Sequence, residues 1–120
     1  MIPCKPDHPF VYWATYSYIG EMVEAGAKCY LYQNGFLHAK TMMVDTMVAS
    51  VGTANMDFRS FGLNFEVNAV IYSEETTQRL ERTFENDMIK ATQVTRNLYE
   101  QRSLVIRVKE QFSRLLSPLL

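Results

Sequence analysis

The chain has 120 residues, and its 12 basic and 13 acidic side chains give a formal net charge of −1. This length predicts one domain, and a composition of 48% hydrophobic and 21% charged residues is typical of a soluble globular protein rather than a disordered, collagenous or low-complexity one. The charge balance argues against a strongly basic nucleic-acid-binding protein. No apolar run approaches the roughly 20 residues that cross a bilayer, and Cys4 and Cys29 are expected to be free thiols.

The first third of the chain predicts a helix followed by a strand. Apolar residues recur at spacings of three and four from residue 10, and the glycine at position 26 fits a C-terminal cap, so a helix is expected over 10–26. Residues 29–33 predict a short strand. Asn34-Gly35 is a strong hairpin signal, and it is expected to join this strand to a second one over 37–44.

The remaining elements follow in the order strand, loop, strand, helix, helix. A third strand is expected over 47–51, a loop over 53–63 and a fourth strand over 65–72. Ser73 is suited to cap a helix that runs to about Arg96, and a last helix is expected over about 103–116. The predicted order is one helix, four strands and two helices, which is an α/β or α+β class. The last helix has one apolar stripe, formed by Leu104, Val108, Phe112, Leu115 and Leu116.

The second predicted strand carries the pattern H-x-K-x4-D in His38, Lys40 and Asp45. Because side chains alternate along a strand, we expect His38 and Lys40 to share one face. An imidazole beside a fixed cation suits a phosphate diester. The cation holds the anionic oxygens, and the imidazole attacks phosphorus or protonates the leaving oxygen. The pattern therefore predicts phosphodiester chemistry.

Polar residues after the third strand extend this candidate site. Thr53 and Asn55 offer neutral donors for phosphate oxygens, and Glu66 is placed to accept from one imidazole nitrogen of His38. The sequence has no Cys/His cluster with zinc spacing and no multi-carboxylate cage, so we expect neither metal nor cofactor. Lys40 and the Asn55 amide are then expected to stabilise the developing charge.

The loop expected over 53–63 is rich in hydrogen-bonding side chains. Asp57, Arg59 and Ser60 are expected to hold it by local hydrogen bonds rather than by contacts with substrate. Arg59 is also able to reach a lipid phosphate.

These motifs resemble those of a known family. The stretch from His38 to Asp45, H-A-K-T-M-M-V-D, followed by Gly52-Thr-Ala-Asn55, resembles the HKD motif of the phospholipase D superfamily. The stretches at 53–61 and 63–68 further resemble the C-terminal half of bacterial cardiolipin synthases. Similar stretches lie at 6–9, 16–21 and 115–120.

The resemblance implies phosphatidyl transfer from one phosphatidylglycerol to another, which gives cardiolipin and glycerol through a phosphohistidine. Members of the superfamily use two HKD motifs that face each other. One histidine is the nucleophile, and the other acts as general acid and then as general base. The resemblance favours the acid–base role for His38 but leaves the order of attack and protonation open.

The resemblance also implies roles for the other residues. It places Lys40, Thr53 and Asn55 at phosphate-binding positions and Glu66 at a position that orients the histidine. Asp45 completes the catalytic motif, although its position at a strand end suggests a structural role. The implied fold is part of an α-β-α sandwich with a mixed sheet.

The chain departs from the superfamily in having a single HKD motif. His8 cannot supply the other one, because no lysine follows two residues later. We therefore expect residues 1–120 to be a single C-terminal phospholipase D-like domain fragment. Its site would be completed by the second HKD half of the parent protein or by a second copy of this chain.

Partners and location are implied in the same way. The resemblance implies phosphatidylglycerol as substrate, an anionic membrane surface as partner and no nucleic acid. It places the parent protein at the bacterial cell membrane with the catalytic part on the cytoplasmic side, whereas the fragment itself is expected to be soluble.

Two other functions are compatible with the residues. One is a phospholipase D-like phosphodiesterase that hydrolyses phospholipid or nucleic acid, although the near-neutral charge counts against nucleic acid. The other is a non-catalytic half that packs on its missing partner or on a membrane.

Overall fold

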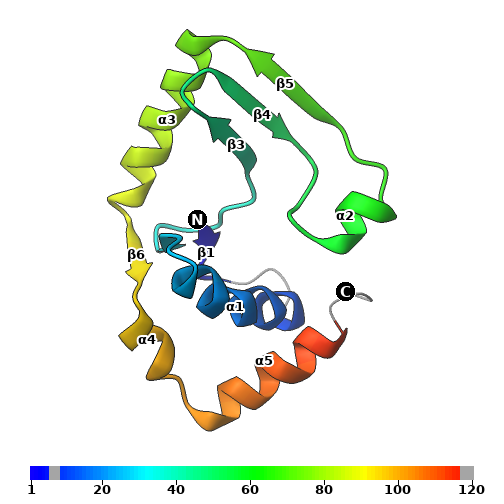
Figure 1. Cartoon of the computed structure of the whole chain (residues 1–120), viewed down its shortest axis with the longest axis vertical. Helices are drawn as coiled ribbons and strands as arrows, with labels where there is room; N and C mark the ends of the chain where they lie inside the picture. Colours follow the sequence, from blue (N-terminus) through cyan, green and yellow to red (C-terminus); the bar gives the residue numbers. More distant parts are fainter. Residues whose placement is uncertain (6–8, 117–120) are drawn as a thin grey trace. The chain divides into compact units, whose positions relative to one another are not determined.

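The computed structural model describes residues 1–5 and 9–116, apart from the side chains at positions 58 and 59. It divides into two compact units. One unit comprises Met1–Phe36 with Ala91–Leu120, and the other comprises Leu37–Lys90. Within the described residues there are six strands and five helices, in an order that mixes the two types along the chain (Figure 1). The class is therefore mixed α and β, as the sequence predicts.

The first unit contains a three-stranded sheet of mixed direction. Its strands are β1 (Ile2–Pro3), β2 (Cys29–Tyr32) and β6 (Ala91–Val94), in the order β1-β2-β6. β1 runs parallel to β2, whereas β6 is antiparallel to it, with Cys29 opposite Val94 and Tyr32 opposite Ala91. The sheet thus joins segments from both ends of the chain.

Three helices accompany this sheet: α1 (Pro9–Glu24), α4 (Arg96–Glu100) and α5 (Leu104–Leu116). α1 packs on α5 through small and polar side chains, since Ser17 of α1 and both Glu110 and Ser113 of α5 are buried. The Tyr99 hydroxyl of α4 donates to the Ser17 carbonyl at 3.0 Å. A Cβ added at Gly20 would lie 2.2 Å from the Tyr99 ring, so the glycine permits this close approach.

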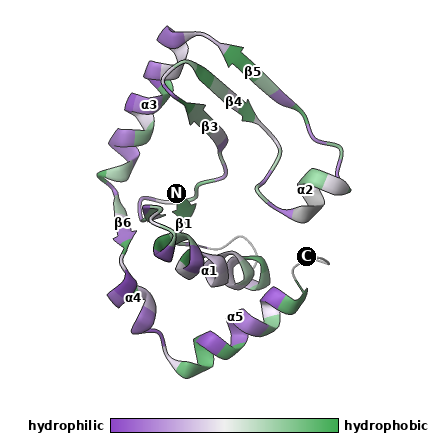
Figure 2. Cartoon of the chain, in the orientation of Figure 1, coloured by the Kyte–Doolittle hydropathy of each residue, from purple (hydrophilic) through white to green (hydrophobic). Residues whose placement is uncertain are grey.

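The second unit is an antiparallel sheet with one long helix. β3 (Lys40–Val44), β4 (Val48–Gly52) and β5 (Asn68–Tyr72) lie in the order β3-β4-β5, and α3 (Glu74–Met88) packs against β3 and β4. The short helix α2 (Phe58–Gly62) lies in the connection from β4 to β5 (Figure 1). Figure 2 shows that the three strands are mostly hydrophobic and that α3 is mostly hydrophilic.

The two faces of this sheet differ in burial. Ala49 is fully buried, and so is Thr77 of α3, which places α3 over the face of Ala49. The opposite face carries the row of Lys40, Gly52 and Asn68, together with the exposed apolar residues Met42, Val44, Val70 and Tyr72. Lys40 therefore lies on the face that α3 leaves open.

Several predicted elements are confirmed in type but not in bounds. The helix predicted over 73–96 ends at Met88 and is followed by β6 and α4. The β-branched residues of the segment Ala91–Val94 favour a strand, and Thr95 caps α4 by accepting from the Leu98 amide. The predicted order of one helix, four strands and two helices is therefore wrong, and the expected single sheet is two separate ones.

The hairpin predicted at Asn34-Gly35 is also wrong. Gly35 does adopt a positive φ of 101°, which suits the turn that its sequence predicts. However, β2 pairs with β1 and β6, whereas β3 pairs with β4 in the other sheet. A turn signal fixes the local backbone but does not determine which strands pair.

The apolar stripe predicted on the last helix does not form the contact with α1. Four of its five residues, Leu104, Val108, Phe112 and Leu115, are exposed and Leu116 is half-buried, whereas Glu110 and Ser113 are buried where α5 packs on α1. Small side chains on α1, such as Ala14 and Ser17, admit this close polar contact. Nothing in the described residues forms a helix long and apolar enough to cross a bilayer.

Candidate active site

The candidate site lies at one edge of the β3–β4–β5 sheet. Lys40 is the first residue of β3, Gly52 the last of β4 and Asn68 the first of β5, and the strand pairing places all three in one row. The chain leaves the sheet at this edge after β4 and returns to it at β5, by way of α2 (Figure 1). Antiparallel pairing thus brings together two stretches that are far apart in sequence.

His38 and Lys40 are neighbours at this edge, but not through strand alternation. β3 begins at Lys40, so the strand predicted over 37–44 is wrong at its start and His38 lies in the preceding segment. The Lys40 ammonium instead turns back and donates to the His38 carbonyl oxygen at 3.1 Å. This hydrogen bond holds the cation beside the backbone of the histidine. The His38 side chain is exposed.

Thr53 anchors the loop after β4 to the segment before β5. The Thr53 amide donates to the Val67 carbonyl oxygen at 3.0 Å, and the Val67 amide donates to the Thr53 hydroxyl at 2.9 Å. Asn55 follows two residues later and is exposed. The pair of hydrogen bonds determines where the loop leaves the sheet, and therefore where Asn55 is presented.

Glu66 is surrounded by hydroxyl and amide donors. The Ser60 hydroxyl donates to its Oε1 at 3.0 Å, and Asn64 Nδ2 donates to the same oxygen at 3.3 Å. Hydrogen bonds from Thr53 and then Ser60 lower the pKa of Glu66 below its ordinary value of 4.5, and Lys40 adds a favourable charge. Glu66 is therefore a carboxylate near neutral pH. Its predicted hydrogen bond with the imidazole of His38 stays a prediction.

The loop after Asn55 contains part of the local hydrogen bonding that the sequence predicts. Asp57 Oδ1 accepts from the Ser60 amide at 2.7 Å at the beginning of α2. The sequence predicts a local role for Asp57 and Ser60, and this is confirmed, although the loop predicted over 53–63 contains the helix α2. The Arg59 side chain lies outside the described residues.

Asp45 lies away from this edge. It forms the β3–β4 turn with Thr46, and the two residues have φ values of 51° and 59°. The Met47 amide closes the turn on the Val44 carbonyl at 3.0 Å. At about 3.3 Å per strand residue, the four steps of β3 from Lys40 to Val44 span roughly 13 Å, and Asp45 lies beyond them. The structure therefore brings together Lys40, Thr53 and Glu66 but not Asp45, whose place in the turn agrees with a structural role.

Sequence reasoning missed two residues at this edge. Asn68 contacts the loop after β4, since its Oδ1 accepts from the Ala54 amide at 3.2 Å. Asn64 supports Glu66. Both follow the motif in a segment rich in asparagine, but only the structure shows their contacts, through the pairing of Asn68 with Gly52 and the hydrogen bond from Asn64 to Glu66.

The arrangement offers a cation held at the His38 backbone, a carboxylate near that cation, and the exposed side chains of His38 and Asn55. The cation and donors suit the non-bridging oxygens of a phosphate diester, and the carboxylate suits an imidazole that gains positive charge. Among the described residues, no group of three or more His, Cys, Asp or Glu side chains is arranged to hold a metal ion.

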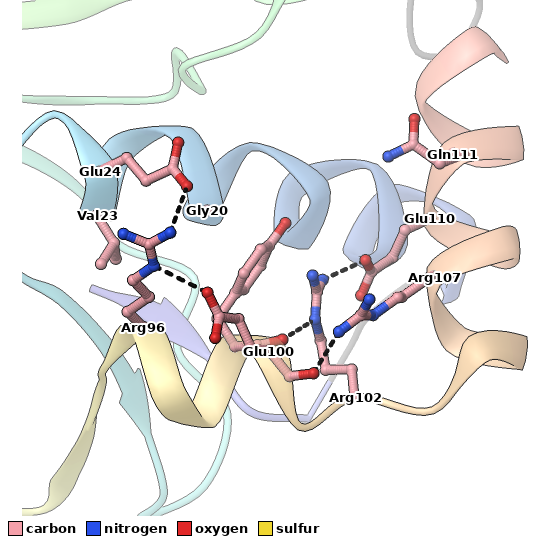
Figure 3. A pocket seen from close by; sticks show the side chains of 10 residues that line it. Gly20, Val23, Glu24, Arg96, Glu100, Arg102, Arg107, Glu110 and Gln111 are labelled. Carbon is pink, nitrogen blue, oxygen red and sulfur yellow. Dashed lines mark hydrogen bonds and ion pairs between the residues drawn. The ribbon is translucent and has the colours of Figure 1, made fainter.

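A pocket of about 210 Å³ lies elsewhere, in the first unit, and its charged side chains bind one another (Figure 3). Arg102 pairs with the buried Glu110, and Arg96 Nε donates to Glu100 at 2.8 Å. Arg107 donates to the Glu100 carbonyl oxygen. Arg96 also lies 4.0 Å from Glu24 of α1, so the pocket is explained as a network of charged side chains that joins α1, α4 and α5.

Comparison with known proteins gives a consistent result. Residues 1–88 match the family described as "Cardiolipin synthase, PLD-like domain". The cardiolipin synthases of Oceanobacillus iheyensis and Listeria monocytogenes are each 62% identical over 120 residues, which is all of this chain and 25% of theirs. Cardiolipin synthase 1 of Staphylococcus epidermidis is 52% identical over the same length and 24% of its own. The chain thus spans about a quarter of these relatives, and no solved structure matches it.

Proposed function

The chain belongs to the phospholipase D-like domain family of cardiolipin synthases, and on this premise we propose that it supplies one half of a phosphatidyltransferase active site. The observation that carries the proposal is 62% identity over the whole chain, together with an edge of one sheet that gathers Lys40, Thr53 and Glu66. The matching relatives are about four times longer, so the activity is proposed for the whole protein.

The proposed reaction has two balanced steps. A histidine nitrogen attacks the phosphorus of one phosphatidylglycerol, an N–P bond forms, and the P–O bond to the headgroup breaks. The departing glycerol oxygen takes a proton from the general acid. A headgroup hydroxyl of a second phosphatidylglycerol then attacks the same phosphorus and gives its proton to that residue, which now acts as base. The N–P bond breaks and cardiolipin is released.

We assign His38 to the acid–base role and Lys40 to the phosphate oxygens. The exposed Asn55 and the Thr53 hydroxyl lie at the same edge and are proposed to bind the phosphate as well. Glu66 is proposed to orient the His38 imidazole and to stabilise its charged form, and its lowered pKa supports this role because a carboxylate is required. Asp45 is proposed to hold the turn rather than to touch substrate.

The partner that completes the site is proposed to be a second HKD motif. The most direct source is the remaining part of the parent protein, and a second copy of this chain is the alternative. We further propose that residues 1–120 form one phospholipase D-like domain, part of an α-β-α sandwich, and that the parent protein works at an anionic membrane surface on the cytoplasmic side, without nucleic acid.

A hybrid enzyme tests the proposal. The 120-residue stretch of the O. iheyensis synthase that aligns with this chain is replaced by this chain, and conversion of phosphatidylglycerol to cardiolipin is followed by phosphorus NMR. We expect cardiolipin from the hybrid and none from its His38→Ala variant. A folded hybrid that makes phosphatidic acid instead identifies a hydrolase, and one that makes neither product contradicts the proposal.

The same assay on the 120-residue chain alone identifies the source of the second motif. Cardiolipin from the isolated chain, lost in His38→Ala, means that two copies complete one site. A folded but inactive chain, beside an active hybrid, means that the rest of the parent protein supplies it.

A further inference from the structure

Asn68 lies outside the H-x-K-x4-D and G-T-A-N patterns, yet its side chain bridges two parts of the candidate site. Its Oδ1 accepts from the Ala54 amide at 3.2 Å, and its Nδ2 donates to the Ser50 hydroxyl at 3.3 Å. Ala54 precedes Asn55 in the loop, and Ser50 lies on β4. One amide group thus uses both its acceptor and its donor to connect the loop to the strand it leaves.

The side-chain amide of Asn68 lies directly over Gly52. A Cβ added at Gly52 would be 2.0 Å from Asn68 Oδ1 and 2.5 Å from Asn68 Cγ. Real Cβ atoms do not approach other atoms so closely, so the glycine provides the space that the amide occupies. The contact depends on both residues, and it lies at the last residue of β4, where the loop begins.

The same row of the sheet ends at Lys40. Lys40 pairs with Gly52 across β3 and β4, and Gly52 pairs with Asn68 across β4 and β5. Paired residues of antiparallel strands project to the same face. Asn68 therefore holds the loop from the face on which Lys40 lies, and it does so one residue before Asn55.

We propose that Asn68 is a positioning residue, which acts on the reaction through Asn55 by holding the loop of residues 53–55 in register with Lys40. The inference rests on the proposed function, in which Asn55 binds the phosphate. Thr53 holds the beginning of the same loop by its hydrogen bonds to Val67. The loop is thus held at two successive residues, and Asn55 is the first one beyond both anchors.

A double-mutant cycle in the hybrid enzyme tests this role. We expect Asn68→Ala to lower kcat about tenfold, with KM changed less than about twofold, because the phosphate contact matters most in the transition state. If Asn68 acts through Asn55, the Asn55→Ala/Asn68→Ala double variant is as slow as Asn55→Ala alone, within about twofold. The matched control is Val70→Ala, two residues later on the same face of β5, which should keep the kcat of the unmodified hybrid.

Losses in kcat that multiply in the double variant overturn the proposal, because they show that Asn68 acts independently of Asn55. An unchanged kcat in Asn68→Ala overturns it as well. A lower melting temperature with unchanged kcat per folded molecule shows a purely structural role, and this outcome also counts against the proposal.

Amide hydrogen exchange separates this inference from the proposed function, since it needs no activity. The Ala54 amide should exchange faster in Asn68→Ala, whereas Asn68→Asp keeps the accepting oxygen and should keep the protection. Equal exchange in Asn68→Ala and the unmodified protein overturns the positioning role even if cardiolipin is made. Faster exchange in a hybrid that makes no cardiolipin supports the contact, while the proposed function fails.

Discussion

Lys40 and Asn68 lie on opposite sides of Gly52 in a single row across β3, β4 and β5. The Lys40 ammonium donates to the His38 carbonyl oxygen, and the side-chain oxygen of Asn68 accepts from the backbone amide of Ala54. Gly52 therefore lies between the part of the candidate site that contains His38 and Lys40 and the part formed by the loop of residues 53–55. Its lack of a side chain is a requirement of the site rather than a feature of the strand alone.

Gly52→Ala is expected to destabilise the protein by about 1–3 kcal/mol, because the added methyl group overlaps the Asn68 amide and the Val67 carbonyl. The Val67 carbonyl is backbone and accepts from the Thr53 amide, so it cannot move without breaking that hydrogen bond. Denaturant unfolding measures the loss of stability. The transferase assay on the hybrid should show a loss of activity at temperatures where the variant is still folded.

Gly62→Ala is the matched control for this substitution. No atom of the described part of the chain lies within 4 Å of a Cβ added at Gly62, which ends α2. We expect its stability to be within about 0.5 kcal/mol of the unmodified protein. If both alanine variants unfold at the same denaturant concentration, the close contact at Gly52 is refuted.

The sequence predicts the chemistry of this edge better than its geometry. The type and order of His38, Lys40, Thr53 and Asn55 are visible as a pattern, because phosphate chemistry requires those side chains. The strand start is not visible, since 37–39 look as suitable for a strand as Lys40–Val44. As a result, the alternation argument for His38 and Lys40 fails, although the two residues are still adjacent through a hydrogen bond.

The larger errors have a common physical cause, which is that pairing and packing are non-local. The segment Ala91–Val94 becomes a strand because β2 offers it a partner, whereas the pattern from Ser73 onward continues to suggest a helix. On α5 the apolar stripe is not the face that packs on α1, because α1 offers small side chains that fit Glu110 and Ser113. Periodicity identifies an amphipathic helix without showing which face its neighbour accepts.

The pKa of Glu66 predicts a pH dependence of stability. Its pKa in the folded protein lies below the ordinary 4.5, because Thr53 and Ser60 donate to the carboxylate. The stabilisation is therefore fully present above 4.5 and is lost as pH falls through the lowered folded-state pKa. The difference in melting temperature between the unmodified chain and Glu66→Gln should shrink as pH falls over this range.

Ser60→Ala sharpens the test of Glu66, because it removes a donor and keeps the carboxylate. Its melting temperature should differ most from that of the unmodified chain above pH 4.5 and least in acid. A difference that is constant over the whole range would contradict the hydrogen bond to Glu66.

Glu110 predicts the opposite pH dependence. Burial raises its pKa above 4.5 even though Arg102 lies against it, and among the residues that the structure describes its buried Oε1 has no hydrogen-bond partner. The folded protein thus binds a proton more tightly than the unfolded chain, so stability falls as pH rises from 4.5 through the folded-state pKa. The melting temperature relative to Glu110→Gln should decrease across that interval and then level off.

The control for Glu110 is Glu100→Gln, an exposed carboxylate on α4 that pairs with Arg96. This pair lies at the surface, where an ion pair is worth about 0–1 kcal/mol. The relative melting temperature of Glu100→Gln should change little over the interval in which Glu110→Gln shows its decrease. Similar curves for the two variants would exclude burial as the cause.

The role of His38 can be determined with a substrate that needs no general acid. In the hybrid enzyme, His38→Ala should lower transfer from phosphatidylglycerol by about 10²–10⁴-fold, because the departing glycerol oxygen then lacks its proton.

The p-nitrophenyl ester of phosphatidic acid is a substrate whose leaving group needs no proton, because p-nitrophenolate is a stable anion. If His38 is the acid, the His38→Ala variant should still release a burst of one p-nitrophenolate per active site, while the second step stays slow because its base is missing. If His38 is the nucleophile, no burst appears, since no N–P bond can form at that position. Lys40→Ala serves as the comparison, because removing the phosphate-holding cation should reduce the burst rate with the p-nitrophenyl ester whichever role His38 has.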